Sequence, residues 1–279
     1  MASAHQKTWR HILDSRPPQV WILTFDREIA LNRQIEYFGK NDIRVNIFSN
    51  HPTVTIHEEN AQFVDKVIVN TLSHEDSTSY CARSWNNIFI KCFLDKSVDG
   101  AFFCQDDTFI KSSDYVKTVL KFSDKFDLIW GPLGDTVFYL KKRVLEKIGW
   151  FDERFLGCYC FDCDFINRCY KKYDKDRLSI EEVHDWGWKH NTIGVSNYVD
   201  TSMHSRAVDE NYKNQHAEMV EKCGDAVMTS AQAHFKAKWS TPGNGINGIG
   251  PVHLYKSPQV ILDIDWYPWF TKKYLKSET

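Results

Sequence analysis

The first half of the chain alternates short apolar runs with segments of helical periodicity, and this alternation limits the fold more than any other feature. Residues 19–25 (QVWILTF) form a mostly apolar run without alternation, which is typical of a strand buried on both faces. Further short strands are predicted at residues 43–48, 66–69, 101–104, 127–130 and 136–140. Helices are predicted from apolar spacing at residues 31–39, 76–93 and 112–122. The order predicts βαβ units in an α/β fold, with a mainly parallel central sheet flanked by helices.

Charge and hydropathy exclude two classes of partner. The chain of 279 residues holds 35 Lys and Arg against 37 Asp and Glu, and no basic run suggests nucleic-acid binding. No apolar stretch approaches the roughly 20 residues that span a bilayer. The polar start (MASAHQKTWRHILDSRPP) lacks the apolar core of a secretion signal. We therefore expect a soluble, cytoplasmic protein without a transmembrane segment.

The eight cysteines fit no usual zinc pattern. Four of them cluster as C-x-C-x2-C-x5-C, at Cys158, Cys160, Cys163 and Cys169, without a second, distant pair of ligands. A chain of this length needs neither disulfides nor a structural metal in order to fold. We therefore expect reduced thiols that pack as small apolar residues.

Polar residues follow two of the predicted strands, at the point where each strand ends. Thr24-Phe25-Asp26-Arg27 comes after the first strand, and Gln105-Asp106-Asp107 comes after the strand at residues 101–104. In sheets of this kind, ligands bind at the carboxyl ends of the strands. Two adjacent carboxylates need a cation to neutralise them, and a hard divalent ion is the usual one. The alternative is a helix cap or an Asx-turn that leads into the next helix.

Two later motifs complete an ordered set. Gly149-Trp150-Phe151-Asp152-Glu153 follows a short predicted helix, and Phe161-Asp162-Cys163-Asp164-Phe165 comes after it. In this order the four motifs resemble those of the GT-A glycosyltransferases, most closely the inverting family-2 type, over about residues 18–200. The sequence is also similar to glycosyltransferases encoded by large algal (chlorella) viruses, which would work in the host cytoplasm. The resemblance implies a GT-A (nucleotide-diphospho-sugar transferase) fold.

On the donor side, the resemblance implies a metal ion and a nucleotide. Asp107 would coordinate the Mn²⁺ or Mg²⁺ ion that bridges the diphosphate of the donor, and Asp106 would lie near the ribose. The other nucleotide-binding positions that it implies are Thr24, Phe25, Arg27, Asn50 and Arg83. No carboxylate stands at Asn50, where the family contacts the base, so GDP-sugars remain an alternative to the favoured UDP-sugars. The alternative for Arg83 is a solvated helix residue that pairs locally.

On the acceptor side, the resemblance makes Asp162 the catalytic base. The apolar neighbour Phe161 would desolvate this carboxylate and raise its proton affinity, which suits a group that takes a proton from a hydroxyl. Asp164 is a candidate contact of the acceptor or sugar. The alternative makes Asp162 a helix N-cap and Asp164 a first-turn acid that complements the helix dipole. Attack by the acceptor hydroxyl on the anomeric carbon would invert its configuration, with no covalent enzyme intermediate.

The segment after the last predicted strand (HDWGWKH) supplies the remaining candidates. The resemblance implies a histidine as third metal ligand there, and His184 is favoured over His190 because it stands at the end of the strand. A lone histidine is more often structural than ligating. Trp186 and Trp188 are candidates for stacking on a sugar, and the alternative is that they cap the edge of the core. Aromatic residues make up 14% of the chain, but most fall at core spacings, so few are left for a sugar.

The predicted organisation is one GT-A catalytic domain at residues 15–235, with a C-terminal lid and tail at 236–279 packed on it. The glycine-rich segment 240–251 lacks the P-loop pattern and suits either a lid or a plain connector. The expected reaction transfers a sugar from a nucleotide-sugar to a glycan or glycoprotein acceptor. Two alternatives stay open. A sugar-nucleotide nucleotidylyltransferase would need a Gly-rich basic loop after the first strand, and a catalytically inactive protein of the same fold would only bind sugar or nucleotide-sugar.

Overall fold

The structure is a computed structural model that describes residues 18–25, 27–70, 81–153, 155, 161–181 and 189–200. The predicted lid and tail at 236–279, and the domain boundary before them, lie outside the described residues. No helix within these described ranges is long and apolar enough to cross a membrane.

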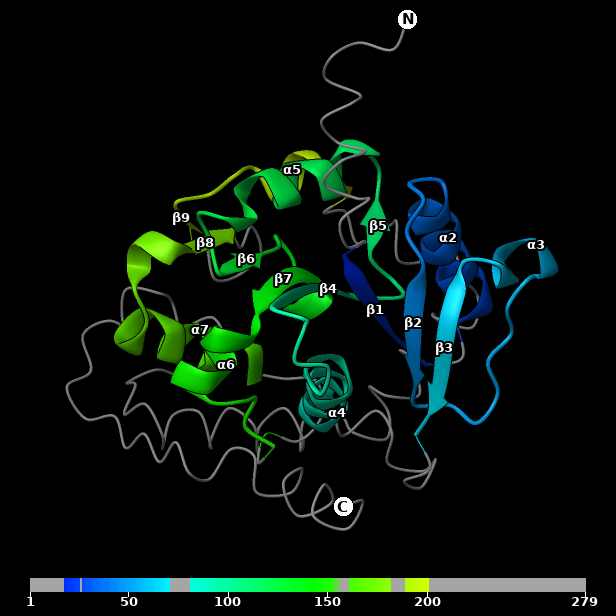
Figure 1. The fold of residues 1–279 in the computed structure, drawn as a ribbon, viewed down its shortest axis with the longest axis horizontal. Coiled ribbons are helices and arrows are strands. Elements are labelled where there is room, and N and C mark those ends of the chain that lie inside the picture. Colours follow the sequence, from blue (N-terminus) through cyan, green and yellow to red (C-terminus); the bar gives the residue numbers. More distant parts are fainter. Residues whose placement is uncertain are drawn as a thin grey trace, which may run out of the picture.

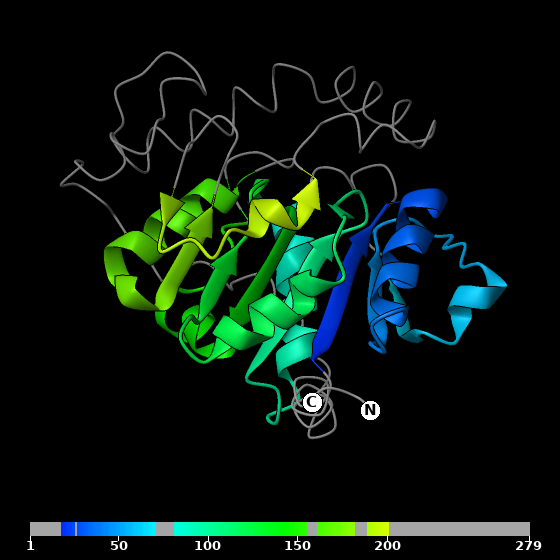
Figure 2. The same ribbon diagram turned by 90° about the horizontal axis from the view of Figure 1, so that it is seen from above.

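The predicted α/β fold with a mainly parallel central sheet is confirmed (Figure 1). Eight strands lie side by side in the order β3-β2-β1-β4-β7-β6-β8-β9, and Figure 2 shows this sheet from above. Their bounds are β1 (Gln19–Thr24), β2 (Val45–Ser49), β3 (Val64–Val69), β4 (Gly100–Gln105), β6 (Leu128–Trp130), β7 (Val137–Lys141), β8 (Leu178–Glu181) and β9 (Lys189–His190). The pairs β3-β2, β2-β1, β1-β4 and β6-β8 are parallel, whereas β7 is antiparallel to β4 and β6, and β9 is antiparallel to β8.

Helices cover both faces of this sheet (Figure 1). The helices α2 (Glu28–Gly39) and α5 (Asp114–Ser123) pack on one face, and α4 (Cys81–Phe93), α6 (Lys142–Ile148) and α7 (Phe161–Lys172) pack on the other. The short helix α3 (Glu58–Ala61) precedes β3, and β5 (Phe109–Ile110) pairs with β10 (Val199–Asp200) in a separate ribbon. Alternate residues of the strands therefore supply two separate cores.

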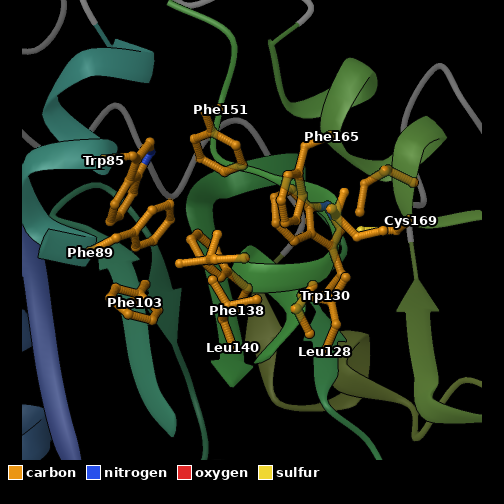
Figure 3. Close-up of a cluster of buried hydrophobic side chains, with 14 of the residues drawn as sticks. Trp85, Phe89, Phe103, Leu128, Trp130, Phe138, Leu140, Phe151, Phe165 and Cys169 are labelled. Atoms are coloured by element: carbon orange, nitrogen blue, oxygen red, sulfur yellow. The ribbon is translucent and has the colours of Figure 1, made fainter. Parts of the chain in front are cut away.

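Aromatic rings form much of the core on the α4 side (Figure 3). Trp85 of α4 lies edge-on to Phe138 of β7, with the ring centroids 5.3 Å apart. Phe138 stacks on Phe103 of β4 at 5.2 Å, and Phe165 of α7 lies 6.1 Å from Trp130 of β6. Large buried rings of this kind dominate core energetics. They fix α4 and α7 to the same face of the sheet, so the polar residues on these helices have defined positions relative to β4.

Most strand boundaries differ from the prediction by one or two residues, and contacts with other segments account for the two largest shifts at a strand start, in β2 and β3. β2 begins at Val45 and not at residue 43, because the backbone N–H of Ile43 donates to the carbonyl of Phe38 at 3.1 Å and closes the turn after α2. β3 begins at Val64, two residues before the predicted start, because Val64 pairs with Val45 before a register shift. Apolar pattern alone does not show either contact.

The described cysteines pack as apolar residues, in line with the prediction. Cys92, Cys104 and Cys169 are buried free thiols. Burial raises the pKa of Cys92 and of Cys169 to about 12, so both thiols stay protonated near neutral pH. Cys158 and Cys160 of the clustered set lie outside the described residues.

A buried carboxylate, Asp127, pairs with two arginines at the amino end of β6. Asp127 accepts hydrogen bonds from Arg177 Nε at 2.6 Å, from the Tyr173 hydroxyl at 2.8 Å and from Arg143. Burial alone would raise the pKa of Asp127, but the hydrogen bonds from Arg177, Arg143 and Tyr173 outweigh it and lower the pKa to about 2. The ionised form is therefore the one that stabilises the fold.

Asp127→Asn is expected to lower the free energy of unfolding by about 2 kcal/mol at neutral pH. The stabilisation by Asp127 is present above its ordinary pKa of 3.8 and is lost as the pH falls toward about 2. Urea unfolding at a series of pH values should therefore show the variant and the wild type converging in acid. Asp124→Asn, a change at an exposed acid after α5, serves as the control and should alter stability little. A difference that persists in strong acid would contradict the assignment.

Candidate functional site

The strand order brings the carboxyl ends of β1 and β4 together. From β1 the chain continues to β2 and β3 on one side, and it returns to β4 on the other side of β1. The backbone N–H of Asp106, just past β4, donates to the carbonyl of Leu23 in β1 at 3.0 Å. Open α/β sheets bind their ligands at this kind of reversal point. The two polar motifs predicted after separate strands therefore meet in space.

Asp106 fastens the loop after β1 to the end of β4. Its Oδ2 accepts hydrogen bonds from the Thr24 hydroxyl at 2.6 Å and from the Phe25 backbone N–H at 3.3 Å. Its Oδ1 accepts a hydrogen bond from Arg27 Nη1 at 2.9 Å. Burial raises the pKa of Asp106 to about 6, although Arg27 opposes this shift. Four of the predicted nucleotide-binding residues thus lie together, and the carboxylate of Asp106 anchors the other three.

Asp107 has a buried oxygen without a hydrogen-bond donor among the residues that the structure describes. Its Oδ2 lies 3.2 Å from Arg27 Nη1, whereas its Oδ1 is buried and accepts no hydrogen bond from the described residues. Leaving a buried acceptor without a donor costs about 1–3 kcal/mol, so a bound cation would stabilise this oxygen. The residue therefore fits the predicted role of metal ligand. In the part of the chain that the structure describes, no three side chains of ligand type gather closely enough to hold a metal ion by themselves.

Asn50 lies at the end of β2, next to the loop after β1. Its backbone N–H donates to the carbonyl of Thr24 at 3.0 Å. Its side-chain Oδ1 accepts hydrogen bonds from Asn70 Nδ2 and from the Ser84 hydroxyl, both at 2.9 Å. Because this oxygen is occupied, Asn50 can offer a ligand only its amide N–H donors. Phe25 lies near it, edge-on to His51 with the ring centroids 5.6 Å apart.

Arg83 of α4 lies beside the 149–153 motif. Its Nε is 3.8 Å from Glu153 Oε2. The neighbouring Asn86 fixes the same segment, since its Nδ2 donates to the Phe151 carbonyl at 2.9 Å and its Oδ1 accepts from the Phe151 N–H at 3.0 Å. The sequence allowed two roles for Arg83, a contact of the nucleotide or a solvated helix residue that pairs locally. The structure shows an ion pair, but with a residue far along the chain.

Asp162 and Asp164 both lie in the first turn of α7, but their surroundings differ. Asp162 is partly exposed, and desolvation by the surrounding protein raises the pKa of its carboxyl. Asp164 is fully buried, and its Oδ2 accepts a hydrogen bond from Arg168 Nε at 2.9 Å. The same guanidinium donates to the carbonyls of Ile148 and Trp150 at 2.9 and 2.8 Å. Through Arg168, Asp164 ties α7 to the end of α6, and its contact with the acceptor or sugar stays a prediction.

Asp135 is a further acid near this edge of the sheet that the sequence motifs did not single out. It lies in the 3₁₀ turn η2 (Gly134–Thr136) between β6 and β7, and it is 8% exposed. Its Oδ2 accepts hydrogen bonds from Trp85 Nε1 and from Gln105 Nε2, both at 2.7 Å. Burial and then the charge of Asp162 raise the pKa of Asp135 to about 7. The signal in the sequence was an acid soon after a predicted strand, in a turn rich in Gly and Pro (GPLGD).

Three predicted residues, His184, Trp186 and Trp188, lie outside the described residues. The alternative histidine, His190, lies in the edge strand β9, where its Nε2 is 2.9 Å from the Lys175 carbonyl. Three strands separate β9 from β4 in the sheet order. His190 therefore lies far from Asp106 and Asp107. Among the described residues, no set of three side chains that includes Asp107 could hold a metal ion.

Comparison with protein families and with curated proteins gives no match, so a function has to be argued from the geometry of these side chains. The described site contains a carboxylate pair held by an arginine, two further acids on neighbouring elements and an amide donor at the end of β2. Such a set can bind a cation, accept protons and orient hydroxyl groups.

Proposed function

We propose that the chain is a GT-A-type glycosyltransferase that transfers a sugar from a nucleotide-sugar to a hydroxyl of a glycan or glycoprotein, with inversion and with Mn²⁺ or Mg²⁺. The observation that carries the proposal is the buried Asp107 oxygen, which has no donor among the described side chains and lies at the point where the strand order reverses. The mainly parallel sheet and the four ordered motifs of the sequence support the same function.

The donor side of the proposed site consists of the loop after β1 and the acid pair. Asp107 would hold the metal ion, which when bound would stabilise the negative charge that builds on the departing diphosphate. Arg27 contributes a second positive charge, since its Nη1 lies 2.9 Å from Asp106 and 3.2 Å from Asp107. The amide N–H of Asn50 would donate to a carbonyl oxygen of the base. Uracil and guanine both carry such an oxygen, and UDP-sugars remain the favoured donors.

Asp162 is the proposed base on the acceptor side. Its raised pKa makes the carboxylate a better proton acceptor than an ordinary aspartate. It lies at the start of α7, which packs on the same face of the sheet as α4. A hydroxyl deprotonated there would attack the anomeric carbon from the side opposite the diphosphate, which requires no covalent intermediate and inverts the configuration.

Asp107→Asn is expected to remove the metal-dependent part of nucleotide binding. Calorimetric titration of the wild type with UDP and with GDP should show affinity that rises on addition of Mn²⁺. The variant should lose this gain by about tenfold or more, because a contact to a charged group is worth about 1.5–3 kcal/mol. Asp114→Asn, at a side chain of α5 that is 65% exposed, is the matched control.

Two results would contradict the proposal in different ways. Nucleotide binding that is independent of Mn²⁺ and unchanged in Asp107→Asn would remove the metal from the site. A wild-type protein that binds neither UDP nor GDP under any of these conditions would refute the transferase itself. Transfer assays with UDP- and GDP-sugars then separate an active enzyme from a protein that binds the donor without turning it over.

A further inference from the structure

Within the described part of the chain, the carboxylate of Asp135 is held through one oxygen, Oδ2. Its Oδ2 accepts two hydrogen bonds of 2.7 Å, from Trp85 Nε1 and Gln105 Nε2, and both donors are neutral groups. Its Oδ1 accepts no hydrogen bond from the described residues. The Oδ2 lone pairs are therefore used, and a ligand that donates a hydrogen bond would meet Oδ1.

Asp135 lies between the residues proposed for the donor and for the acceptor. Its turn η2 contacts both β4, which leads directly into Asp106 and Asp107, and α7, which begins at Phe161. The charges of Asp162 and of Asp107 both reach Asp135 and favour its protonated form, with Asp162 the stronger of the two. The carboxyl group of Asp135 therefore interacts more strongly with the proposed base than with the proposed metal ligand.

We propose that Asp135 binds the acceptor, with Oδ1 accepting a hydrogen bond from a hydroxyl adjacent to the one that Asp162 deprotonates. This inference rests on the proposed transferase function. The bonds from Trp85 and Gln105 orient the carboxylate before any ligand arrives, and such pre-orientation lowers the entropy lost on binding. Asp135 would thus fix which hydroxyl of the acceptor meets the base.

The acids around Asp135 also restrict the chemical class of acceptor that can bind at this position. The charges of Asp162 and of Asp107 both act on the carboxyl group of Asp135. A carboxylate or phosphate on the acceptor would add a further negative charge to this set, which is unfavourable at short range. The part of the acceptor that contacts Asp135 is therefore a neutral sugar and not a uronate or a phosphorylated sugar.

Gln105 forms a matched pair with Asp135. The amide supplies the N–H that Asp135 requires, whereas a carboxylate at residue 105 would face a second carboxylate across a 2.7 Å contact. This contact explains in physical terms why the polar motif after β4 reads Gln-Asp-Asp and does not begin with an acid. It also supplies a second variant, since Gln105→Glu should disturb Asp135 without altering Asp135 itself.

The test uses Asp135→Asn, which keeps the size of the side chain and an oxygen for Trp85 and Gln105. The acceptor probes are the methyl glycosides of glucose, galactose and N-acetylglucosamine. Methyl glucuronide is the negatively charged comparison compound. In wild-type protein loaded with Mn²⁺ and UDP, neutral probes are expected to shift the NMR signal of the Trp85 indole N–H, which a Trp85→Phe spectrum assigns. The glucuronide should bind at least about tenfold more weakly.

In Asp135→Asn, the KM for an accepted neutral glycoside should rise about tenfold or more, while the affinity for UDP with Mn²⁺ is retained. An unchanged acceptor KM, or a Trp85 signal that no neutral probe moves, would overturn the inference. Loss of UDP affinity in the variant would also overturn it, because Asp135 would then serve the donor. If Asp135→Asn fails to fold, Gln105→Glu should raise the acceptor KM in the same way, because it removes the N–H donor that orients Asp135.

Failure of this inference is distinguishable from failure of the transferase proposal. A chain that binds UDP with Mn²⁺ but shows no response of Trp85 to neutral glycosides keeps the proposed function and loses the role of Asp135. A chain that binds no nucleotide fails the proposed function, and the acceptor role of Asp135 falls with it. In that case a Trp85 response to neutral glycosides would identify a sugar-binding site of another kind.

Discussion

Replacing Asp162 by Asn is expected to lower kcat for sugar transfer by about 10²–10⁴-fold, the range that a positioned general base contributes. The amide cannot take the proton of the acceptor hydroxyl, but it keeps the shape of the side chain at the start of α7. The affinity for UDP with Mn²⁺ should stay at the wild-type level, because Asp162 contributes nothing to the donor side of the proposed site. Steady-state kinetics and calorimetry on the same preparations measure both quantities.

The pH profile separates a base from a merely structural acid. Because the pKa of Asp162 is raised, the wild-type kcat should fall on the acid side as this carboxylate becomes protonated. The residual rate of Asp162→Asn should lack this acid limb. Asp176→Asn, at an exposed acid just before β8, is the control and should keep both kcat and its pH dependence. An unchanged kcat in Asp162→Asn would move the base elsewhere, and Asp135 would then be the nearest candidate.

Much of the sheet was predictable because its strands are short apolar runs separated by helices. The direction of β7 was not predictable, since a strand buried on both faces has the same apolar pattern whether it runs parallel or antiparallel to its neighbours. Local pattern fixes where a strand lies in the sequence. Its partner and direction depend on the connections that the rest of the chain makes.

Part of the site was predictable by the same reasoning. Thr24 and Asp106 meet because the ends of neighbouring parallel strands share one edge of a sheet. Asp135 was missed because its partners Trp85 and Gln105 lie 50 and 30 residues away, and an acid in a Gly/Pro-rich turn is common. Contacts between segments that are far apart in the sequence produce no recognisable pattern in the local sequence.

The different surroundings of Asp162 and Asp164 follow from helix geometry. Residues two apart on a helix point about 200° apart, because each residue turns the helix by about 100°. If one of the two acids points into the core, the other must therefore face away from it. The structure buries Asp164, and its burial is tolerated because Arg168 supplies the compensating charge.

Arg168→Met is expected to lower the free energy of unfolding by about 3–5 kcal/mol, which is the usual result of breaking a buried ion pair by removing one partner. The side chains of Arg168 and Asp164 are both 0% exposed, so the carboxylate would lose its guanidinium in a place that water does not reach. The carbonyls of Ile148 and Trp150 would lose their hydrogen bonds from Arg168 as well. Urea unfolding followed by circular dichroism measures the change.

Arg44→Met provides the matched control, because Arg44 pairs with Asp65 at 2.7 Å on the surface, with the two side chains 57% and 48% exposed. That change should alter stability by about 1 kcal/mol or less. The double variant Arg168→Met with Asp164→Leu should recover part of the loss, since it leaves no buried charge behind. Equal losses in the free energy of unfolding for Arg168→Met and Arg44→Met would show that the buried ion pair does not stabilise the start of α7. Because Asp162 lies in that same turn, a real loss at Arg168 should also weaken transfer, even in protein that remains folded.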